Sequence, residues 1–409
     1  MKILFLSSWF PYPPINGAKI RVYNLIRELA KYHEISLLSF VRTFSLDEAM
    51  QNTSYLEKYC KSVQIVPALS YFPNKLSATL GLFSRKPRSV IQTYSHKMSA
   101  LIKEACKTES FDAMVASEVN MPYLVSQLAS EVTGMPKIVD AIELSLAKDA
   151  YNNAGTMKQR VRNGLTWLKL KGFTKFVLQN VEACTVPSEI EKQNVLEIMP
   201  AYTNIKVIPH SLDLAHYTVP VDNPHPNLLV YTGSFTYFAN LDAMEYFLRE
   251  IYHQIKLSAP KVRLQVIGDT GNVHLERWPI DESVTFTGLI QDVRPKIAKS
   301  WVSIVPLRYG AGTRLKIIES LALGTPVVST YKGAEGLDVT DGKNILLAET
   351  PSEFANAVLR VLHDPDLRES LSREGRRLVV EKYSSSSMGV KFNSLLDQIV
   401  NSKNNKSVL

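Results

Sequence analysis

The chain has 409 residues, of which 45% are hydrophobic and 21% charged, and its 47 Lys and Arg against 39 Asp and Glu give a formal net charge of +8. This composition excludes a disordered chain, and the length suits two domains with separate cores. The positive balance favours an anionic partner without specifying which. Because Cys60, Cys106 and Cys184 are scattered, we expect neither disulfides nor a cysteine metal site.

The N-terminus predicts a buried strand rather than an export signal. Residues 1–6 are mostly apolar, but polar Ser7 and Ser8 follow at once, so this run is too short for a signal peptide. Elsewhere no apolar run reaches the length of a transmembrane helix. We therefore expect a cytoplasmic protein, with peripheral attachment to the inner face of the membrane as the alternative to a free one.

Strands and helices alternate from the start of the chain. Residues 1–8 lead through a proline-broken loop into an amphipathic helix at 19–32, and strands follow at 34–40 and 62–67. This alternation is typical of an α/β fold with a parallel sheet. Gly17 lies in the first loop, at the carboxyl end of a strand, where such sheets bind ligands. It is a binding candidate or an ordinary turn glycine.

Two stretches of the N-terminal half, residues 69–94 and 156–175, contain no acidic residue. In the second, apolar side chains alternate with cations: Trp167, Leu168, Leu170, Phe173 and Phe176 with Lys158, Arg160, Arg162, Lys169, Lys171 and Lys175. A basic and aromatic helix suits an anionic membrane surface, and a helix with its lysines in water fits equally well. No nucleic-acid recognition motif accompanies the charge, so we expect no such partner.

Two later strands of this half end in polar residues. The strand at 111–116 is followed by Ser117 and Glu118, which are candidates for the acceptor side of a site. The segment 137–145 contains Asp140, which could act as a base towards a hydroxyl group or cap the following loop. A proline-rich stretch then marks a linker, which we place at residues 209–225.

The second half repeats the alternation, and polar or glycine residues follow its strands. Ser234 and Asn240 come after the strand at 228–232 and could form hydrogen bonds to a ligand. Gly268 and Gly288 end the next two strands. Because parallel strands share one carboxyl edge, we expect these four residues on the same side of the sheet.

The most informative stretch is residues 301–331. It predicts a buried strand at 302–307, a loop with Gly310 and Gly312, a helix at 313–323 and a second strand at 326–330. Thr313 is a plausible N-cap of this helix, and Gly324 a plausible residue just beyond its end.

Two cations stand at the predicted start of this helix. Arg314 and Lys316 would oppose the helix dipole unless a polyanion such as a diphosphate lies there. Glu319 lies one turn further on, and its carboxylate could accept two hydroxyl groups of a ribose. The alternative is an ordinary crossover with a solvated basic turn. Leu315 replaces the third glycine of a dinucleotide fingerprint, and the spacing does not fit a Walker phosphate loop.

The run E-S-L-A-L-G-T-P-V-V at residues 319–328 resembles the second half of the Glu-x7-Glu signature of retaining glycosyltransferases of family 4. Ala311 occupies the place of the first Glu, as in a branch of that family with G-x-G-T-R-L-K at this point. The resemblance implies that Glu319 holds the donor ribose and that Arg314 and Lys316 hold the diphosphate.

The resemblance also implies the GT-B architecture, in which two doubly wound Rossmann-like domains face each other across a cleft. Residues 1–208 would form the acceptor-side domain, completed by a C-terminal helix at 388–409, and residues 226–387 the nucleotide-sugar-binding domain. The donor would lie in the cleft.

Further site residues follow from the same resemblance. Gly17 would let the backbone approach the donor phosphate, and Gly268 and Gly288 would cover the nucleobase. A family histidine near Ser117 is absent, and the backbone amides of Gly310, Gly312 and Thr313 would replace the missing first Glu. Such enzymes generally need neither a divalent metal nor a cofactor.

The function implied is the retaining transfer of a sugar from a UDP- or GDP-type donor to a hydroxyl of a glycan or lipid-linked acceptor, in bacterial polysaccharide or glycolipid synthesis. Two alternatives remain open at this point. One is a nucleotide-sugar epimerase of the same architecture, and the other is a degenerate, non-catalytic protein that binds nucleotide or a partner transferase.

Overall fold

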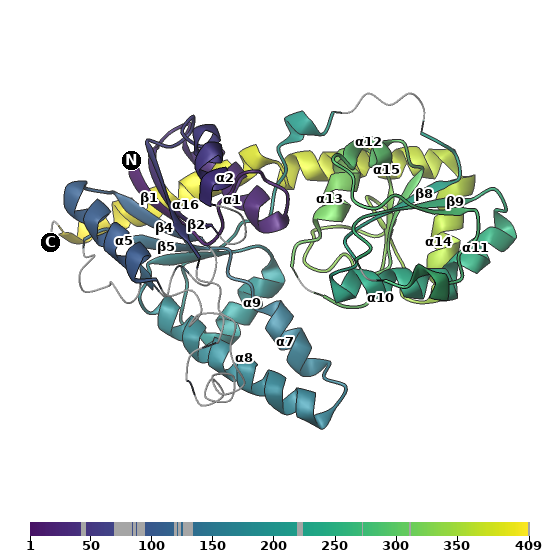
Figure 1. Cartoon of the computed structure of the whole chain (residues 1–409), viewed down its shortest axis with the longest axis horizontal. Coiled ribbons are helices and arrows are strands. Elements are labelled where there is room, and N and C mark those ends of the chain that lie inside the picture. Colours follow the sequence, from purple (N-terminus) through teal and green to yellow (C-terminus); the bar gives the residue numbers. More distant parts are fainter. Residues whose placement is uncertain are drawn as a thin grey trace. The chain divides into compact units, whose positions relative to one another are not determined.

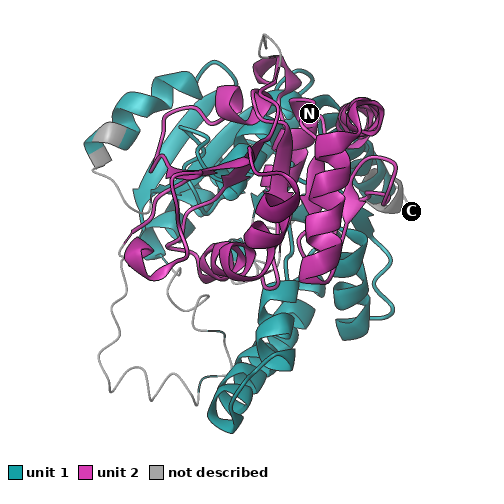
Figure 2. Cartoon of the chain, turned by 90° about the vertical axis from the view of Figure 1, so that its right-hand side faces the viewer, with its two compact units in different colours: residues 1–211, 385–409 teal, residues 212–384 magenta. Residues whose placement is uncertain are grey.

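A computed structural model of the chain describes every residue except 42–45, 69–83, 85–86, 88–94, 118–120, 122–123, 126–133, 219–223, 272, 311 and 408–409. The chain divides into two compact units (Figure 2). Unit 1 comprises Met1–Ser211 and Ser385–Leu409, and unit 2 comprises Leu212–Ser384. Nearly all of the basic stretch 69–94 lies outside the described residues.

Unit 1 is built on a parallel sheet with the strand order β3-β2-β1-β4-β5-β6-β7 (Figure 1). Its strands are β1 (Lys2–Ser7), β2 (Glu34–Val41), β3 (Ser62–Pro67), β4 (Ala113–Ser117), β5 (Lys137–Asp140), β6 (Ala183–Val186) and β7 (Ile205–Val207). The strand order reverses between β1 and β4. In a doubly wound sheet this reversal is the switch point, where ligands bind beyond the carboxyl ends of the strands.

The helices of unit 1 are α1 (Gly17–Leu29), α2 (Leu46–Asn52), α5 (His96–Thr108), α7 (Ser145–Asn152), α8 (Met157–Leu178), α9 (Glu189–Ile198) and α16 (Ser385–Ser407). The Asn16 side chain caps α1 by accepting the N–H of Lys19 at 3.1 Å. At the other end of the sequence, Met388, Phe392 and Leu396 of α16 are buried in the same cluster as residues of α1 and β1. The C-terminal helix therefore belongs to the core of unit 1.

Unit 2 contains a second parallel sheet, with the order β10-β9-β8-β11-β12-β13. Its strands are β8 (Leu228–Thr232), β9 (Arg263–Ile267), β10 (Val284–Phe286), β11 (Val302–Val305), β12 (Val327–Ser329) and β13 (Leu346–Leu347). The order reverses between β8 and β11, so the loops that follow these two central strands flank the switch point of this unit.

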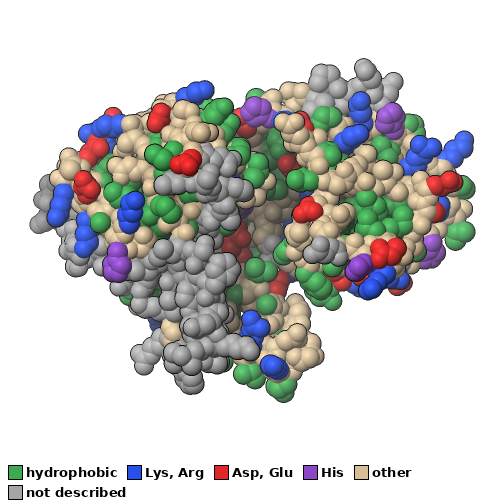
Figure 3. Space-filling model, in the orientation of Figure 1, with side chains coloured by type: hydrophobic (Ala, Val, Ile, Leu, Met, Phe, Trp, Pro, Cys, Tyr) green, Lys and Arg blue, Asp and Glu red, His purple; other side chains and the backbone are tan. Residues whose placement is uncertain are grey.

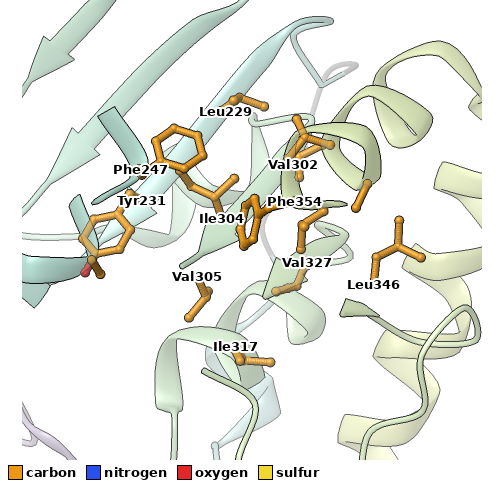
Figure 4. Close-up of a cluster of buried hydrophobic side chains, with 14 of the residues drawn as sticks. Leu229, Tyr231, Phe247, Val302, Ile304, Val305, Ile317, Val327, Leu346 and Phe354 are labelled. Atoms are coloured by element: carbon orange, nitrogen blue, oxygen red, sulfur yellow. The ribbon is translucent and has the colours of Figure 1, made fainter. Parts of the chain in front are cut away.

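One continuous hydrophobic core holds unit 2 together. Figure 4 shows Tyr231 and Ile304 of the central strands with Phe247 and Phe354 of the covering helices. Those helices are α10 (Phe238–Tyr246), α11 (Tyr252–Ser258), α12 (Arg294–Ala298), α13 (Leu315–Ala322), α14 (Pro351–His363) and α15 (Pro365–Lys382). Phe247 itself lies in the π-helical turn Phe247–Ile251, which joins α10 to α11. Two doubly wound α/β sheets are thus present, as predicted. In the described part of the chain, no helix is both long and apolar enough to span a lipid bilayer.

Candidate functional site

Helix α13 begins two residues later than predicted, at Leu315. Thr313 is therefore not its N-cap. The Thr313 carbonyl instead accepts the N–H of Leu315 at 3.0 Å in a tight turn, and Arg314 occupies the N-cap position without a capping side-chain bond. Because of this tight turn the helix begins only at Leu315, so that Lys316 lies in its first turn and Arg314 lies just before the helix.

The predicted end of α13 is confirmed at Gly324, which has a φ of +74°. Its N–H reaches the carbonyl of Leu321 at 3.1 Å, and the N–H of Thr325 reaches Ser320 at 2.9 Å. This pair of bonds is a Schellman motif, in which glycine accepts the left-handed conformation without a Cβ penalty.

The ammonium of Lys316 lies against the end of the neighbouring strand β8. It donates to Oδ1 of Asn240 at 2.9 Å and to the Tyr231 hydroxyl at 3.3 Å, and it stands 4.4 Å from the centre of the Tyr231 ring. The loop after β8 has no cation of its own between Gly233 and Asn240. Lys316 of the loop–helix unit that follows β11 supplies that charge instead.

The surroundings of Lys316 weaken its hold on a proton. Removal of water by the protein lowers the pKa of its ammonium, the nearby Arg314 lowers it further and Glu319 partly opposes both, so that the pKa falls to about 7. An anion placed beside this ammonium would restore the charge, because an opposite charge favours the protonated form. The electrostatics around Lys316 therefore favour the binding of an anion.

Arg314 folds back over the glycine loop. It is buried, and its Nη2 donates to the carbonyl of Gly310 at 2.6 Å. Gly310 has a φ of +98°, and a Cβ there would lie 2.9 Å from the Tyr237 hydroxyl and 3.2 Å from Nη1 of Arg314. The position thus requires glycine for its backbone conformation and for the close approach of the guanidinium.

The glycines that follow the strands of unit 2 pack backbone against backbone. A Cβ on Gly233 would stand 2.9 Å from Nζ of Lys316, and one on Gly268 only 2.1 Å from the carbonyl oxygen of Gly233. The N–H of Gly268 donates to the carbonyl of Gly288 at 3.1 Å. Nearby, Asn240 donates to the carbonyl of Ser234 at 2.8 Å. The structure therefore brings these predicted donor-side residues together at one edge of the sheet.

Glu319 is held by a tyrosine that lies far from it in sequence. The Tyr217 hydroxyl donates to Oε1 of Glu319 at 2.8 Å. Burial raises the pKa of Glu319 above its usual value, and the bond from Tyr217 and the charge of Lys316 offset this only in part. One carboxylate oxygen is thereby fixed, which orients the group for a further hydroxyl donor.

Sequence reasoning missed the aromatic residues of the site. Tyr231 and Tyr217 contact Lys316 and Glu319 across 85 and 102 residues of chain. Phe238 and Tyr309 lie on the loops beside the site, with ring centroids 5.8 Å apart, and both are exposed. No spacing in the sequence indicates these contacts, because the sheet order alone creates them.

The remaining candidates of unit 2 are less defined. Gly312 has a φ of +88°, as a glycine loop requires, and both it and Thr313 are half-buried. Ala311, the place of the missing first Glu, lies outside the described residues. Whether the loop amides replace that carboxylate stays a prediction.

The candidates of unit 1 lie at its own switch point. Gly17 is the first residue of α1, and Ser117 ends β4 in register with Ser7 of β1. The Ser117 side chain is fully buried, and its hydroxyl finds no hydrogen-bond partner among the described residues. Glu118 lies outside them.

Asp140 is a structural ion pair rather than a base, which corrects the prediction. The side chain is 0% exposed and receives Nε and Nη2 of Arg21 at 2.9 and 2.7 Å, and the Thr185 hydroxyl at 2.6 Å. Burial alone would raise the pKa of Asp140, but Arg21 and Thr185 outweigh it and lower the pKa. A buried carboxylate with both oxygens occupied can neither meet a substrate hydroxyl nor cap a loop.

Comparison with known proteins gives this geometry a context. Residues 226–364 match the family described as glycosyl transferases group 1. An uncharacterised 44.6 kDa protein of the cps region of Klebsiella pneumoniae is 18% identical over 395 residues, which cover 94% of this chain and 97% of that protein. The lipopolysaccharide core biosynthesis glycosyltransferase LpsE of Rhizobium meliloti is 31% identical over 132 residues, 31% of this chain and 38% of that one.

Solved structures share the fold over nearly the whole chain. Anabaena Alr3699/HepE, in complex with UDP and glucose, has a TM-score of 0.64 at 14% identity and covers 97% of this chain and 100% of its own. Sucrose-phosphate synthase of Thermosynechococcus elongatus has a TM-score of 0.68 at 19% identity, with 98% and 100% covered. The predicted fold class, with two doubly wound Rossmann-like α/β domains, is confirmed.

Proposed function

We propose that the chain, whose residues 226–364 match the glycosyl transferases group 1 family, transfers a sugar, with retention of configuration, from a nucleoside-diphosphate sugar to an acceptor hydroxyl. The observation that carries this proposal is the position of Lys316. Its ammonium sits at the carboxyl end of β8 beside Asn240, next to the guanidinium of Arg314. Two cations at a switch point suit a diphosphate.

The reaction needs little covalent help from the protein. The bond between the sugar anomeric carbon and the diphosphate oxygen breaks, the acceptor oxygen bonds to that carbon from the same face, and the hydroxyl proton passes to a phosphate oxygen. Lys316, Arg314 and the amides at the start of α13 would stabilise the charge that develops on the departing diphosphate. Glu319, with one oxygen bound by Tyr217, would accept the ribose hydroxyls.

The donor and acceptor follow by analogy with the relatives. HepE was crystallised with UDP and with UDP-glucose, which supports a UDP-sugar, and a GDP-sugar is the alternative. A relative from a cps region and another of lipopolysaccharide core synthesis support a glycan or lipid-linked acceptor. We expect catalysis without a divalent metal, so EDTA should leave the transfer rate unchanged.

Thermal-shift measurements with UDP-, GDP- and ADP-glucose test the donor assignment. A ligand that binds only the folded protein raises its melting temperature, by an amount set by concentration over Kd. We expect UDP-glucose to give the largest shift in the wild type and a much smaller one in Lys316→Ala. Equal shifts in both proteins would remove Lys316 from the donor site.

The two other functions are separated by incubation with donor alone. An epimerase would produce a new sugar nucleotide without acceptor, and a non-catalytic binder would leave the donor intact with every acceptor. A transferase would transfer the sugar to an added acceptor and form glycosylated product in proportion to UDP.

We also propose that α8 attaches the enzyme to an anionic membrane surface. Its exposed apolar side chains Met157, Val161, Leu165 and Leu168 recur every three or four residues, and Phe176 follows about two turns later, so that all five form one stripe. The opposite side of the helix buries Trp167 and Phe173 within unit 1. Cations alternate with the stripe and no acid interrupts it; Figure 3 shows hydrophobic and cationic side chains close together near its outer end.

Sedimentation with lipid vesicles tests this attachment. The wild type should bind vesicles rich in phosphatidylglycerol and not those of phosphatidylcholine alone. Arg160→Gln with Arg162→Gln should weaken binding roughly 30-fold, because each cation near the surface contributes about 1 kcal/mol. Leu257→Glu, at an equally exposed apolar position of unit 2, serves as the control and should bind as the wild type does. Equal binding to both lipids would contradict the proposal.

A further inference from the structure

We propose that Glu143, positioned by His210, binds hydroxyl groups of a sugar acceptor at the carboxyl edge of the unit 1 sheet. This inference rests on the proposed transferase function and names a contact on the acceptor side. Both residues belong to unit 1: Glu143 lies in the turn after β5, and His210 lies shortly after β7. The carboxyl ends of parallel strands are where ligands of doubly wound sheets bind.

The turn that carries Glu143 is fixed at its start. Ala141 adopts a left-handed φ of 61°, a conformation that is strained for a residue with a Cβ. Its N–H donates to the Thr185 hydroxyl at 3.0 Å, and the N–H of Ile142 donates to the Thr185 carbonyl at 3.0 Å. Strained backbone that the surroundings maintain is a recurrent property of functional sites.

The turn is fixed at its end as well. The N–H groups of Leu144 and Ser145 donate to the two carboxylate oxygens of Glu191, at 2.8 and 3.0 Å. Glu191, Leu144 and Ser145 are all buried. Within this turn Glu143 alone is exposed, with 40% of its side chain open. The surrounding bonds therefore present one carboxylate on a rigid support.

His210 sets the direction of that carboxylate. Its Nε2 lies 3.2 Å from Oε1 of Glu143, while only 9% of the imidazole is exposed. The hydrogen bond and charge of His210 lower the pKa of Glu143, although burial acts to raise it. An ionised carboxylate only accepts hydrogen bonds, so Nε2 is the donor.

The other imidazole nitrogen indicates that His210 is not there for stability alone. Nδ1 of His210 is buried, and within the described part of the chain it has no hydrogen-bond partner. A buried unsatisfied polar atom is destabilising. We therefore infer that His210 orients the Glu143 carboxylate, although its own Nδ1 stays unsatisfied.

The charges facing the pair favour an ionised Glu143. The Arg21 guanidinium of α1 lowers the pKa of Glu143, and Asp140 of β5 acts in the opposite direction. Arg21 is itself fixed by Asp140 and by the carbonyl of Ile208, which it reaches at 2.9 Å. Glu143 is thus an oriented anion with one oxygen held by His210 and the other available for hydroxyl donors, which is how carboxylates bind sugars.

The test measures transfer from UDP-glucose to octyl glycosides (glucoside, galactoside and rhamnoside), using the glycoside on which the wild type is most active. Glu143→Ala should raise KM for that glycoside roughly 10- to 100-fold, the loss expected for hydrogen bonds to a charged group. KM for UDP-glucose and the thermal shift it causes should stay unchanged. Glu57→Ala, an exposed carboxylate of the same unit ahead of β3, should behave as the wild type.

His210 is tested as a positioning residue. His210→Ala should also raise the acceptor KM, and His210→Gln, whose amide can donate to Glu143, should recover most of the loss. The Glu143→Ala, His210→Ala double variant should be no worse than Glu143→Ala, because the two act through one contact. An acceptor KM unaffected by Glu143→Ala in an active enzyme overturns this inference alone. Absence of both donor binding and transfer in the wild type overturns the proposed function, and this inference with it.

Discussion

The ammonium of Lys316 is held between an amide oxygen and a phenol ring rather than in open water. Its contacts with Asn240 at 2.9 Å and with the face of Tyr231 at 4.4 Å keep it at the end of β8. None of these partners carries a full negative charge. The charged ammonium is therefore poorly stabilised in the free protein, which is why its pKa is about 7. A bound anion would stabilise the charged form.

Donor affinity should therefore depend on pH through Lys316. Because its pKa in the free protein is about 7, the ammonium is charged below that pH and loses its proton above it. Affinity for UDP-glucose, whose diphosphate does not titrate here, should be constant from about pH 6 to 7. Above pH 7 it should fall by up to about tenfold per pH unit until the bound-state pKa is reached.

Isothermal titration calorimetry at several pH values measures this effect, and proton uptake on binding gives a second readout. Lys316→Arg is the matched variant, because a guanidinium stays charged over the whole range. Its affinity should be lower or similar but independent of pH. A wild-type affinity that does not change between pH 7 and about pH 9 would contradict the assignment.

Sequence patterns placed some residues of the candidate site in one segment and misjudged others for a physical reason. Arg314, Lys316 and Glu319 fall at fixed spacing after a glycine loop, so one segment contains all of them. Asp140 was misread because Arg21, which neutralises it, lies 119 residues away. A strand-terminal Asp looks the same in sequence whether it meets solvent or a buried guanidinium.

The element that organises the donor site is the row of loops after β8, β9 and β11. The backbones after β8 and β9 approach so closely that a Cβ added to Gly268 would lie 2.1 Å from the carbonyl oxygen of Gly233. Lys316 then reaches across this row from α13 to the β8 loop. The placement of the cation thus depends on glycine packing in a neighbouring loop.

Gly268→Ala should disrupt this row. Its backbone has a φ of +150° and the added Cβ would collide with Gly233, so we expect a large fall in melting temperature and loss of UDP-glucose binding. Gly342→Ala is the control, because Gly342 has a φ of +71° and a Cβ added there would meet no atom within 4 Å. That change should cost only about 1–2 kcal/mol of backbone strain and leave binding intact. Equal effects of the two substitutions in calorimetry would argue against the close packing.

Element ends show what local sequence determines. Gly324 ends α13 as predicted, because a left-handed residue with a Schellman motif is a local requirement. The start was predicted two residues early, since the tight turn at Thr313 depends on the loop that Arg314 closes over Gly310. Local chemistry fixes the stop signal, and tertiary contacts fix the start.

At the scale of the whole molecule, the core of one unit is formed by a continuous segment of the chain and that of the other by two separate segments. The core of unit 2 lies within Leu212–Ser384, whereas unit 1 needs the C-terminal helix α16. The residues that α16 contributes to the buried cluster of unit 1 are Met388, Phe392, Leu395, Leu396 and Ile399. Alternation of strands and helices predicted both sheets, and the family resemblance, rather than any pattern, predicted that the last helix completes the first domain.

A chain that ends at Ser384 should lose unit 1 and keep unit 2. Each buried side chain of α16 contributes about 1.5–3 kcal/mol to stability. The free energy of unfolding of a domain is about 5–15 kcal/mol, and the five side chains together exceed the lower end of that range. Hydrogen exchange should show β1 unprotected and β8 protected, with UDP-glucose binding retained in weakened form. A chain that ends at Val400 keeps all five buried residues and should exchange as the full protein does. Protection of β1 in the shorter chain would refute this dependence.

The most direct measurement is the rate of sugar transfer from UDP-glucose by the wild type, Arg314→Ala and Lys316→Ala, each checked for folding by its melting temperature. If the two side chains stabilise the departing diphosphate, each substitution should lower kcat/KM about 100-fold or more, the usual loss for a group that stabilises transition-state charge. The melting temperatures should stay close to that of the wild type. Wild-type transfer rates in both folded variants would contradict the placement of the diphosphate at the start of α13.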